Sequence, residues 1–170
     1  MDTEVCLGDR RRAHIRPVLP SDARALSTAI ANADPETLRL RFLGWAPLLD
    51  DATVRRLVEV DYQWRLALIA FDPDDRGIGI ARYESRSGGD VAEIAVAVDP
   101  GWRRVGLGSR LLTMLGEAAV ARGIRRLVAI YLVGNHDVEG LLKECGLSCS
   151  YHVSQGLVEA ELLLPQATDS

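Results

Sequence analysis

The chain has 170 residues, of which 48% are hydrophobic and 26% charged, and its formal net charge is −4. This length and this balance are typical of one globular domain. The acidic charge argues against a nucleic-acid-binding platform, which is usually basic. No apolar run approaches the roughly 18 residues of a membrane span. We therefore expect neither nucleic acid nor a membrane as a partner.

The cysteines and the first twelve residues indicate whether the chain has a metal site and where in the cell it is located. The three cysteines, Cys6, Cys145 and Cys149, are odd in number and follow no metal-ligand spacing. The first twelve residues lack the apolar core of a signal peptide. We expect a cytoplasmic protein without a metal site. Its predicted parts are a flexible N-terminus (1–12), one domain (13–164) and a tail (165–170).

The first half of the chain predicts two strands with helical segments between them. Proline and aspartate residues mark the expected helix starts. The predicted elements are a strand over 13–18, a helix that opens at 20–22 and ends before Pro35, a short helical turn over 35–41, a helix over 50–60 and a strand over 66–71.

The second half begins with a predicted hairpin and continues with alternating helices and strands. Its strands, 77–85 and 91–98, flank Ser87-Gly88-Gly89. Apolar residues then keep helical spacing from Leu107 to Gly123. The remaining predicted elements are a strand over 125–133, a helix over 135–145 and two strands within 148–163. The strand–helix–strand unit should be parallel and right-handed.

Between the strand 91–98 and the next helix lies the loop AVDPGWRRVGLGSRLL, residues 97–112, which predicts a phosphate-binding site. Glycine costs about 1 kcal/mol against alanine inside a helix, so two glycines at a helix start need a reason. A helix N-terminus offers free N–H groups, and glycines let a phosphate approach them. The third glycine of a dinucleotide motif and the lysine of a Walker loop are both missing.

The pattern that remains, Arg103-x-x-Gly106-x-Gly108 preceded by Val96 to Val98, resembles the acetyl-CoA motif of the GNAT N-acetyltransferases. The segments PETLRLRFLGWAPLL, VEVDYQWRLALIAFD and VAEIAVAVDPGWRRVGLGSRLL are similar to bacterial Pat-type protein lysine acetyltransferases. The resemblance covers about residues 13–150. It implies the GNAT fold, α/β with an α+β mixed sheet: a central, mostly antiparallel sheet flanked by helices, whose parallel pair of strands, 91–98 and 125–133, splays apart for CoA.

The same resemblance implies acetyl-CoA as co-substrate and a set of residues that bind it. The backbone of Val96 and Val98 would pair with the pantetheine arm, the amides from Arg103 to Ser109 would hold the pyrophosphate, and Asn135 would contact the pantetheine end. The full set is Val96, Ala97, Val98, Arg103, Arg104, Val105, Gly106, Leu107, Gly108, Ser109 and Asn135. The chain departs from many GNAT enzymes at Leu142, where they carry a tyrosine that protonates the leaving thiolate. Pat-type members tend to lack this tyrosine, and a CoA thiolate leaves readily without it.

Glu93 is the candidate general base. A lysine amine with a pKa of ~10.4 is almost entirely protonated at pH 7, so attack on a thioester benefits from a base. The strand 91–98 is otherwise apolar on both faces, and a carboxylate there is costly unless it is paired or functional. Glu93 also falls on the segment that resembles the catalytic glutamate of Pat-type enzymes. The alternative is a glutamate that is solvated or paired with an arginine such as Arg82.

The sequence thus predicts transfer of an acetyl group from acetyl-CoA to a primary amine, in one ternary complex. A protein lysine is the expected acceptor. A small amine or amino acid as acceptor, and a non-catalytic module that senses acyl-CoA, remain alternatives. Asp61 and Tyr62 either line the acceptor site or form a turn between a helix and a strand. The chain is expected to be a monomer or a homodimer.

Overall fold

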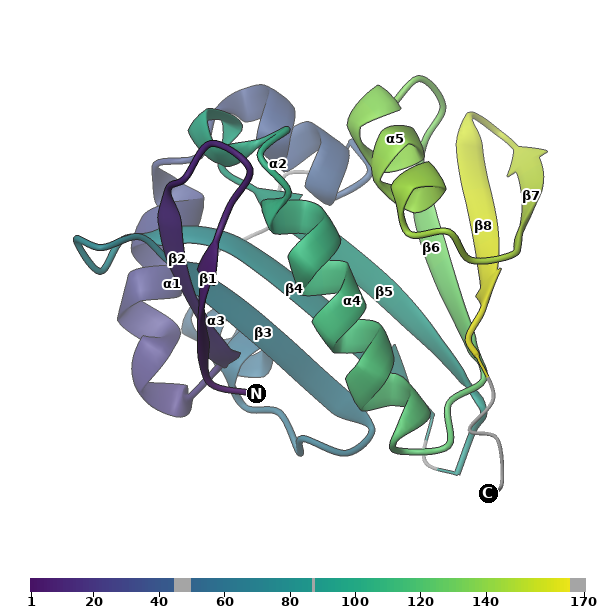
Figure 1. Cartoon of the computed structure of the whole chain (residues 1–170), viewed down its shortest axis with the longest axis horizontal. Helices are drawn as coiled ribbons and strands as arrows, with labels where there is room; N and C mark the ends of the chain where they lie inside the picture. The colour runs from purple at the N-terminus through teal and green to yellow at the C-terminus, as the bar shows by residue number, and fades with distance from the viewer. Residues whose placement is uncertain (45–49, 87, 166–170) are drawn as a thin grey trace.

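The computed structural model describes residues 1–44, 50–86 and 88–165, and its ribbon is shown in Figure 1. Eight strands form one sheet in the order β1-β2-β3-β4-β5-β6-β8-β7. The strands are β1 (Thr3–Cys6), β2 (Arg12–Pro17), β3 (Arg65–Phe71), β4 (Gly77–Ser85), β5 (Val91–Val98), β6 (Arg126–Leu132), β7 (Cys149–Ser154) and β8 (Leu157–Leu163). All neighbouring strands are antiparallel except β5 and β6, which are parallel. The predicted mixed sheet with one parallel pair is confirmed.

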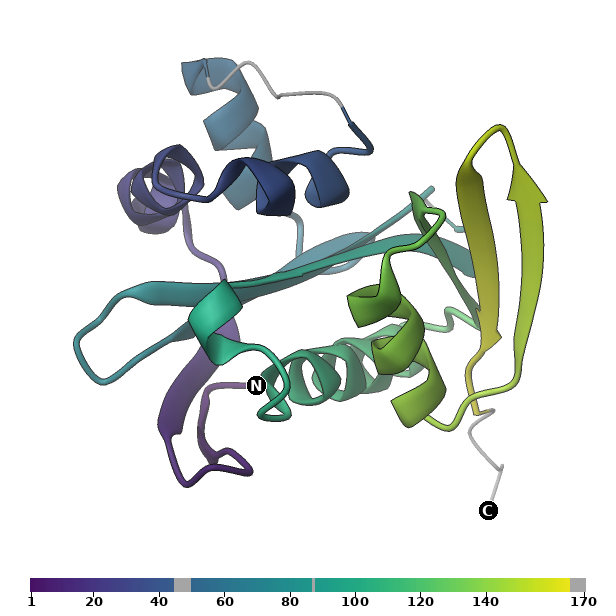
Figure 2. The ribbon, with the colours of Figure 1, turned by 90° about the horizontal axis from the view of Figure 1, so that it is seen from above.

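Helices cover both faces of this sheet, as Figure 2 shows. One face carries α1, α2 and α3, and the other carries α4 and α5. The helices are α1 (Ala23–Ala31), α2 (Pro35–Arg41), α3 (Asp51–Val58), α4 (Leu107–Val120) and α5 (His136–Glu144), with short 3₁₀ turns at Pro20–Asp22 and Pro100–Trp102. Within the described ranges, no helix combines the length and the apolar character needed to cross a bilayer.

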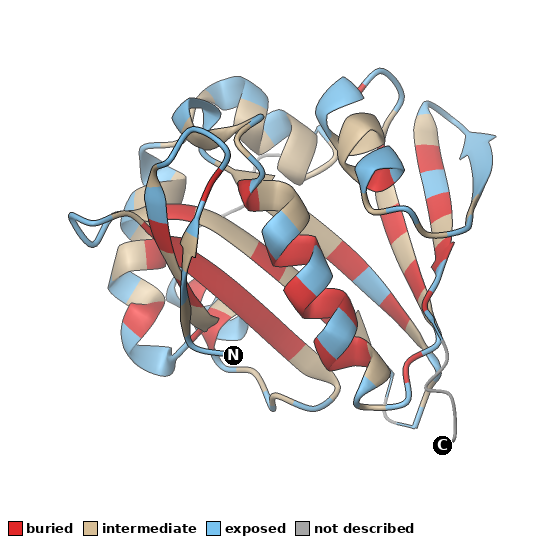
Figure 3. Cartoon of the chain, in the orientation of Figure 1, coloured by how far each residue is buried: buried red, intermediate tan, exposed pale blue. Residues whose placement is uncertain are grey.

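The core lies on both sides of β3, which is buried along nearly its whole length (Figure 3). Alternate β3 side chains reach two clusters: Leu66, Leu68 and Ala70 pack with α4, while Ala67 and Ile69 pack under α1 and α3. Burial on both faces explains why the segment is apolar at consecutive positions rather than at every second one.

Helix α4 crosses the sheet because one stripe of its surface is apolar. Leu107, Leu111 and Leu115 are fully buried, which is the spacing of one helix face. Beyond the end of the helix, Gly123 has φ +81° and donates its N–H to the carbonyl of Val120 (3.0 Å). The helix predicted from Leu107 therefore ends slightly before the predicted glycine, as helices with a left-handed glycine stop commonly do.

The N-terminal segment differs from its prediction as a flexible start. β1 pairs antiparallel with β2, with Thr3 opposite Ile15 and Cys6 opposite Arg12. The residues of β1 alternate between partly buried and exposed, so the segment carries too little apolar pattern to be recognised. It is ordered by pairing with its neighbour at the edge of the sheet.

The hairpin prediction is confirmed with its bounds unchanged, β4 over Gly77–Ser85 and β5 over Val91–Val98. Ser87, in the predicted connection, lies outside the described residues. β5 is thereby fixed on one side by β4, from Ala92 to Val98. On its other side, β5 pairs with β6 only from Val91 to Ile94. The strands then part, which frees one edge of β5 from Ala95 onward.

Candidate active site

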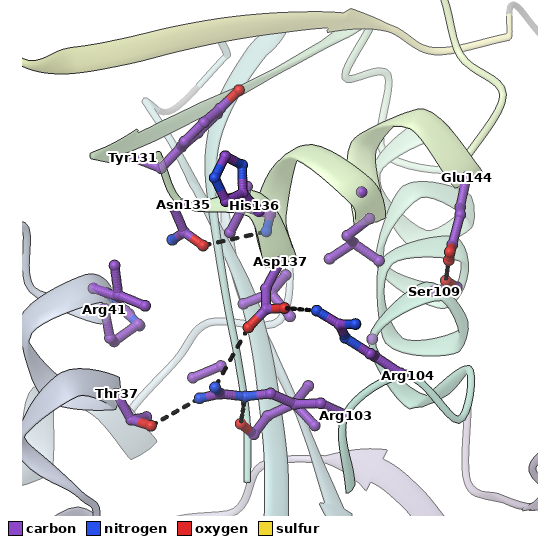
Figure 4. Close-up of a pocket in the computed structure, with 18 of the residues that line it drawn as sticks. Thr37, Arg41, Arg103, Arg104, Ser109, Tyr131, Asn135, His136, Asp137 and Glu144 are labelled. Carbon is purple, nitrogen blue, oxygen red and sulfur yellow. Dashed lines mark hydrogen bonds and ion pairs between the residues drawn. The ribbon is translucent and has the colours of Figure 1, made fainter. Parts of the chain in front are cut away.

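A cavity of about 540 Å³ opens where β5 and β6 part (Figure 4). This volume lies within the usual range for small-molecule sites, about 300–1,000 Å³. Its walls come from the free end of β5, the loop before α4, the start of α4, the inner side of α5 and the end of α2. Nine of the predicted cofactor-binding residues line it: Val96, Ala97, Val98, Arg103, Arg104, Gly106, Gly108, Ser109 and Asn135.

The two glycines at the start of α4 differ in their backbone conformation and in their surroundings. Gly106 precedes the helix with φ +91°, a conformation that residues with a Cβ rarely adopt, and nothing lies within 4 Å of where a Cβ would be. Gly108 has an ordinary conformation, but a Cβ there would lie 3.4 Å from a methyl group of Leu141. Gly106 thus turns the chain into the helix, while a Cβ at Gly108 would make only an ordinary contact with Leu141 on α5. Together they leave the helix N-terminus bare toward the cavity.

Arg103 ties three elements together at the cavity wall. Its Nε donates to the backbone oxygen of Val98 (3.1 Å), and one of its Nη atoms donates to the hydroxyl of Thr37 on α2 (2.8 Å). The other Nη lies 3.4 Å from the carboxylate of Asp137. Arg104, whose side chain is 86% exposed, reaches the same carboxylate at 3.7 Å. Asp137 therefore holds two guanidinium groups beside the helix N-terminus, as Figure 4 shows.

Asn135 begins α5 and is buried, with 6% of its surface exposed. Its Oδ1 accepts a hydrogen bond from the backbone N–H of Val138 (3.3 Å), so it caps the helix. No hydrogen bond among the described residues uses its amide NH₂ group. That donor is available to a molecule in the cavity.

Two predicted contacts, Val105 and Leu107, do not line the cavity. Leu107 is fully buried in the core beneath α4, and Val105 packs against the same core. The carbonyl of Val105 accepts a hydrogen bond from Gly8 in the turn between β1 and β2 (3.0 Å). Their side chains thus anchor the loop from below.

Glu93 is exposed, which corrects the expectation of a carboxylate buried in an apolar strand. It shares one face of β5 with Ala95 and Ala97, both of which line the cavity, while Ala92 and Ile94 point to the core under α4. The small side chains of Ala95 and Ala97 leave space between this face and α2. This face of the strand is therefore apolar although it borders a cavity and not packed core. Glu93 itself does not line the cavity, but its charge acts on Arg41, which does, and on Arg82 of the neighbouring strand.

Residues 12–148 match the family described as the acetyltransferase (GNAT) domain. The chain belongs to the GNAT acetyltransferase family. An acetyltransferase of Pseudomonas aeruginosa is 28% identical over 138 residues, which cover 79% of this chain and 74% of that protein. These matches make the chain an acetyl-CoA-dependent N-acetyltransferase.

Two solved structures show how far the GNAT likeness extends. The GNAT domain of Streptomyces lividans PAT superposes with a TM-score of 0.88 at 27% identity, over 96% of this chain and 97% of that one. A spermidine N-acetyltransferase from Vibrio cholerae, solved with CoA and spermine, superposes with a TM-score of 0.72 at 14% identity, over 89% and 95%. The second likeness shows the fold alone.

The GNAT cavity also includes residues that the sequence did not indicate. They share positions on α2, β6 and α5, far from the phosphate loop in sequence: Thr37, Arg41, Tyr131, Asp137 and Glu144. The carboxylate of Glu144 accepts a hydrogen bond from the hydroxyl of Ser109 (2.9 Å), which ties α5 to α4. Burial is the main cause that raises the pKa of Tyr131, so its phenol stays protonated. Of these five residues, only Asp137 had a signal in the nearby sequence: it falls in the first turn of a helix, where an acidic side chain is stabilising.

Asp61 and Tyr62 belong to the turn between a helix and a strand, which is one of the two roles considered for them from the sequence. Asp61 Oδ1 accepts from the backbone N–H groups of Gln63 (2.9 Å), Trp64 (2.7 Å) and Arg65 (2.8 Å). The hydroxyl of Tyr62 donates to the carbonyl of Val18 (2.8 Å). Both side chains hold the turn between α3 and β3, and neither lines the cavity.

Proposed function

We propose that the chain transfers an acetyl group from acetyl-CoA to the side-chain amine of protein lysines. The observation that carries the proposal is the free edge of β5 beside a bare helix N-terminus, in one cavity with nine of the expected cofactor contacts. The likeness to the Streptomyces lividans PAT domain over almost the whole of both chains supports the Pat-type substrate class.

The cavity residues suit the parts of acetyl-CoA. The N–H groups at the start of α4 and the guanidinium groups of Arg103 and Arg104 would hold the pyrophosphate, because an anion is favoured at a helix N-terminus. The free backbone of β5 from Ala95 to Val98 would pair with the amides of the pantetheine arm. The free NH₂ group of Asn135 would donate to a carbonyl of that arm.

Glu93 would act as the general base for attack by the acceptor. The amine nitrogen forms a bond to the acetyl carbon while Glu93 accepts its proton, and the carbon–sulfur bond breaks to release the CoA thiolate. Help of this kind contributes about 10²–10⁴-fold. No tyrosine stands at position 142 to protonate the thiolate, and Leu142 is 2% exposed and packed in the core, so its side chain does not reach the cavity.

Transfer to a small amine is the second candidate. The observation in its favour is the shared fold of the spermidine N-acetyltransferase solved with CoA and spermine. Labelled acetyl-CoA offered with folded lysine-bearing proteins, lysine peptides, polyamines and amino acids separates the two. Label in protein or peptide lysines supports the proposal, and label confined to small amines contradicts it. Tight binding of acetyl-CoA with no labelled product would contradict both and favour a non-catalytic acyl-CoA sensor.

A further inference from the structure

Six charged side chains, Glu93 among them, gather on the sheet face covered by α2 and α3. Glu84 on β4 lies directly opposite Glu93 on β5 in the antiparallel register. Two like charges opposite each other destabilise a strand pair. Four arginines surround them, and we call these the arginine cluster: Arg41 on α2, Arg56 on α3, Arg65 on β3 and Arg82 on β4.

Glu84 is the partner of three members of the cluster. Its carboxylate lies 3.3 Å from Arg82, 3.8 Å from Arg56 and 3.9 Å from Arg65. Only the contact with Arg82 is short enough for a hydrogen bond, and those with Arg56 and Arg65 are ion pairs without one. The Nε of Arg65 is in fact buried without a hydrogen-bond partner among the described residues. The cluster therefore holds more donors than its own carboxylates can accept.

Arg41 is the member that is left over. Among the residues that the structure describes, no carboxylate lies within ion-pair distance (4.0 Å) of its guanidinium, whose one described contact is the ring of Phe42 at 5.0 Å. Burial is the main cause that lowers the pKa of Arg41 to about 10; the charge of Arg82 acts in the same direction and that of Glu93 against it. Arg41 is partly buried, and a partly buried cation without an ion-pair partner is costly unless an anion joins it.

Arg41 also stands where two cavities meet. It lines the 540 Å³ cavity from α2, on the side away from Ser109 and Glu144 (Figure 4). It also lines a second cavity of about 1070 Å³, between α1, α2 and the sheet, to which Arg82 contributes. An acceptor that enters this second cavity would meet Arg41 and Arg82, the two arginines on which the charge of Glu93 acts. The lining of this cavity carries four arginines and four aspartates, so its positive charge is local to Arg41 and Arg82 and is not a surplus of the whole cavity.

We infer that the acceptor carries a carboxylate next to its reacting amine, and that Arg41 together with Arg82 binds this carboxylate. For a protein acceptor, this means a lysine flanked by aspartate or glutamate. Guanidinium groups bind carboxylates in a fixed, often bidentate geometry. The same positive charges disfavour a polyamine and help a bound lysine lose its proton. The inference rests on the proposed function, whose site it deepens.

Three matched peptides test it, with one lysine flanked by glutamate, glutamine or arginine. We expect kcat/KM for the glutamate peptide to exceed that for the glutamine peptide about tenfold at low salt, and the arginine peptide to be the poorest. Arg41→Gln should reduce the glutamate-to-glutamine ratio several-fold. Because Arg41 also lines the acetyl-CoA cavity, the effect is read as this ratio and not as the rate. Arg39→Gln is the matched control, since Arg39 lies on the same helix in an exposed pair with Glu36 (2.8 Å).

Equal kcat/KM for the three peptides would overturn the inference and leave the proposed function standing. A glutamate preference that Arg41→Gln leaves unchanged would overturn the role of Arg41. If no peptide is acetylated but small amines are, Nα-acetyl-lysine and its neutral amide decide the question. A preference for the carboxylate form that Arg41→Gln removes would support the inference, and equal rates would overturn it. Acetylation of none of these acceptors would overturn both the inference and the proposed function.

Discussion

The guanidinium of Arg11 lies 4.2 Å from the ring centre of Trp102 and donates to the carbonyl of Gly101 (2.9 Å). A few residues away, Gly8 donates its N–H to Val105. The turn between β1 and β2 thus holds the loop that precedes α4 from both sides of Arg103. The N-terminal hairpin is part of the support of the phosphate site.

Arg11→Ala should therefore weaken CoA binding, although Arg11 does not line the cavity. An exposed cation–π contact contributes ~0.5–1 kcal/mol and one hydrogen bond a similar amount. Because these contacts brace the loop and do not touch the cofactor, we expect part of this sum to reach CoA binding, as a rise in Kd of about threefold to tenfold. Isothermal titration calorimetry measures this. Arg12→Ala, an exposed arginine next in sequence, is the control and should leave Kd unchanged. Equal effects of the two changes would count against the bracing role.

Gly106→Ala should cost stability and CoA affinity together. A left-handed residue with a Cβ is strained by ~1–2 kcal/mol, and Gly106 has φ +91°. The melting temperature without ligand should fall by several degrees, and the further rise that CoA gives through binding to the folded state should shrink. Gly88→Ala, with φ +75° in the distant hairpin, should lower the melting temperature without reducing the rise caused by CoA. In the unaltered chain, ATP that stabilised as much as CoA would contradict the pantetheine site.

Two substitutions at Asn135 separate its cap from its proposed contact with the cofactor. Asn135→Asp keeps an acceptor for the Val138 N–H, so the helix should stay capped, but it removes the NH₂ donor. We expect near-normal stability with weaker acetyl-CoA binding. Asn135→Ala should lose both, with ~0.5–2 kcal/mol of stability from the missing cap. Thermal unfolding and calorimetry give the two readouts. Unchanged acetyl-CoA affinity in Asn135→Asp would remove Asn135 from the cofactor site.

The ion pair between Arg16 and Asp22 should dominate the acid sensitivity of the fold. Its two hydrogen bonds are both 2.8 Å, and Asp22 is buried. Arg16 is the main cause that holds the pKa of Asp22 below its ordinary value. The pair's contribution is therefore complete above about pH 4, the pKa of an unfolded aspartate, and is lost as the pH falls through the lower folded pKa.

Asp22→Asn leaves Arg16 without its carboxylate and should cost roughly 3 kcal/mol at neutral pH. The difference from the unaltered chain should shrink as the pH falls below about 4. Denaturant unfolding at several pH values measures it. Glu36→Gln, in the exposed pair with Arg39, is the control and should cost much less than Asp22→Asn. A difference between Asp22→Asn and the unaltered chain that stays constant down to pH 2 would contradict the assignment.

Local patterns predicted most of the fold. The hairpin, the helix after the phosphate loop and the final strand pair all carry their signal within a short stretch of sequence, as apolar spacing and turn residues. β1 was missed because its stability comes from pairing with β2 and not from its own four residues.

The site was only partly predictable, because the loop motif is local and the rest of the cavity is not. The contact between Arg103 and Thr37 joins residues 66 positions apart, and no spacing rule marks it. Likewise, an apolar strand does not reveal that Ala95 and Ala97 face a cavity rather than packed core. That is why Glu93 was expected to be buried and is exposed.

The measurement that tests the proposed mechanism most directly is the turnover of Glu93→Gln on a verified acceptor at pH 7. Glutamine keeps the size and polarity of the side chain but cannot accept the proton. We predict a fall in kcat of about 10²–10⁴-fold, little change in acetyl-CoA affinity, and partial recovery at high pH, where the amine is deprotonated without help. Glu159→Gln, an exposed glutamate on β8, should leave turnover unchanged. Turnover close to that of the unaltered chain in Glu93→Gln would contradict the role of Glu93 as the base.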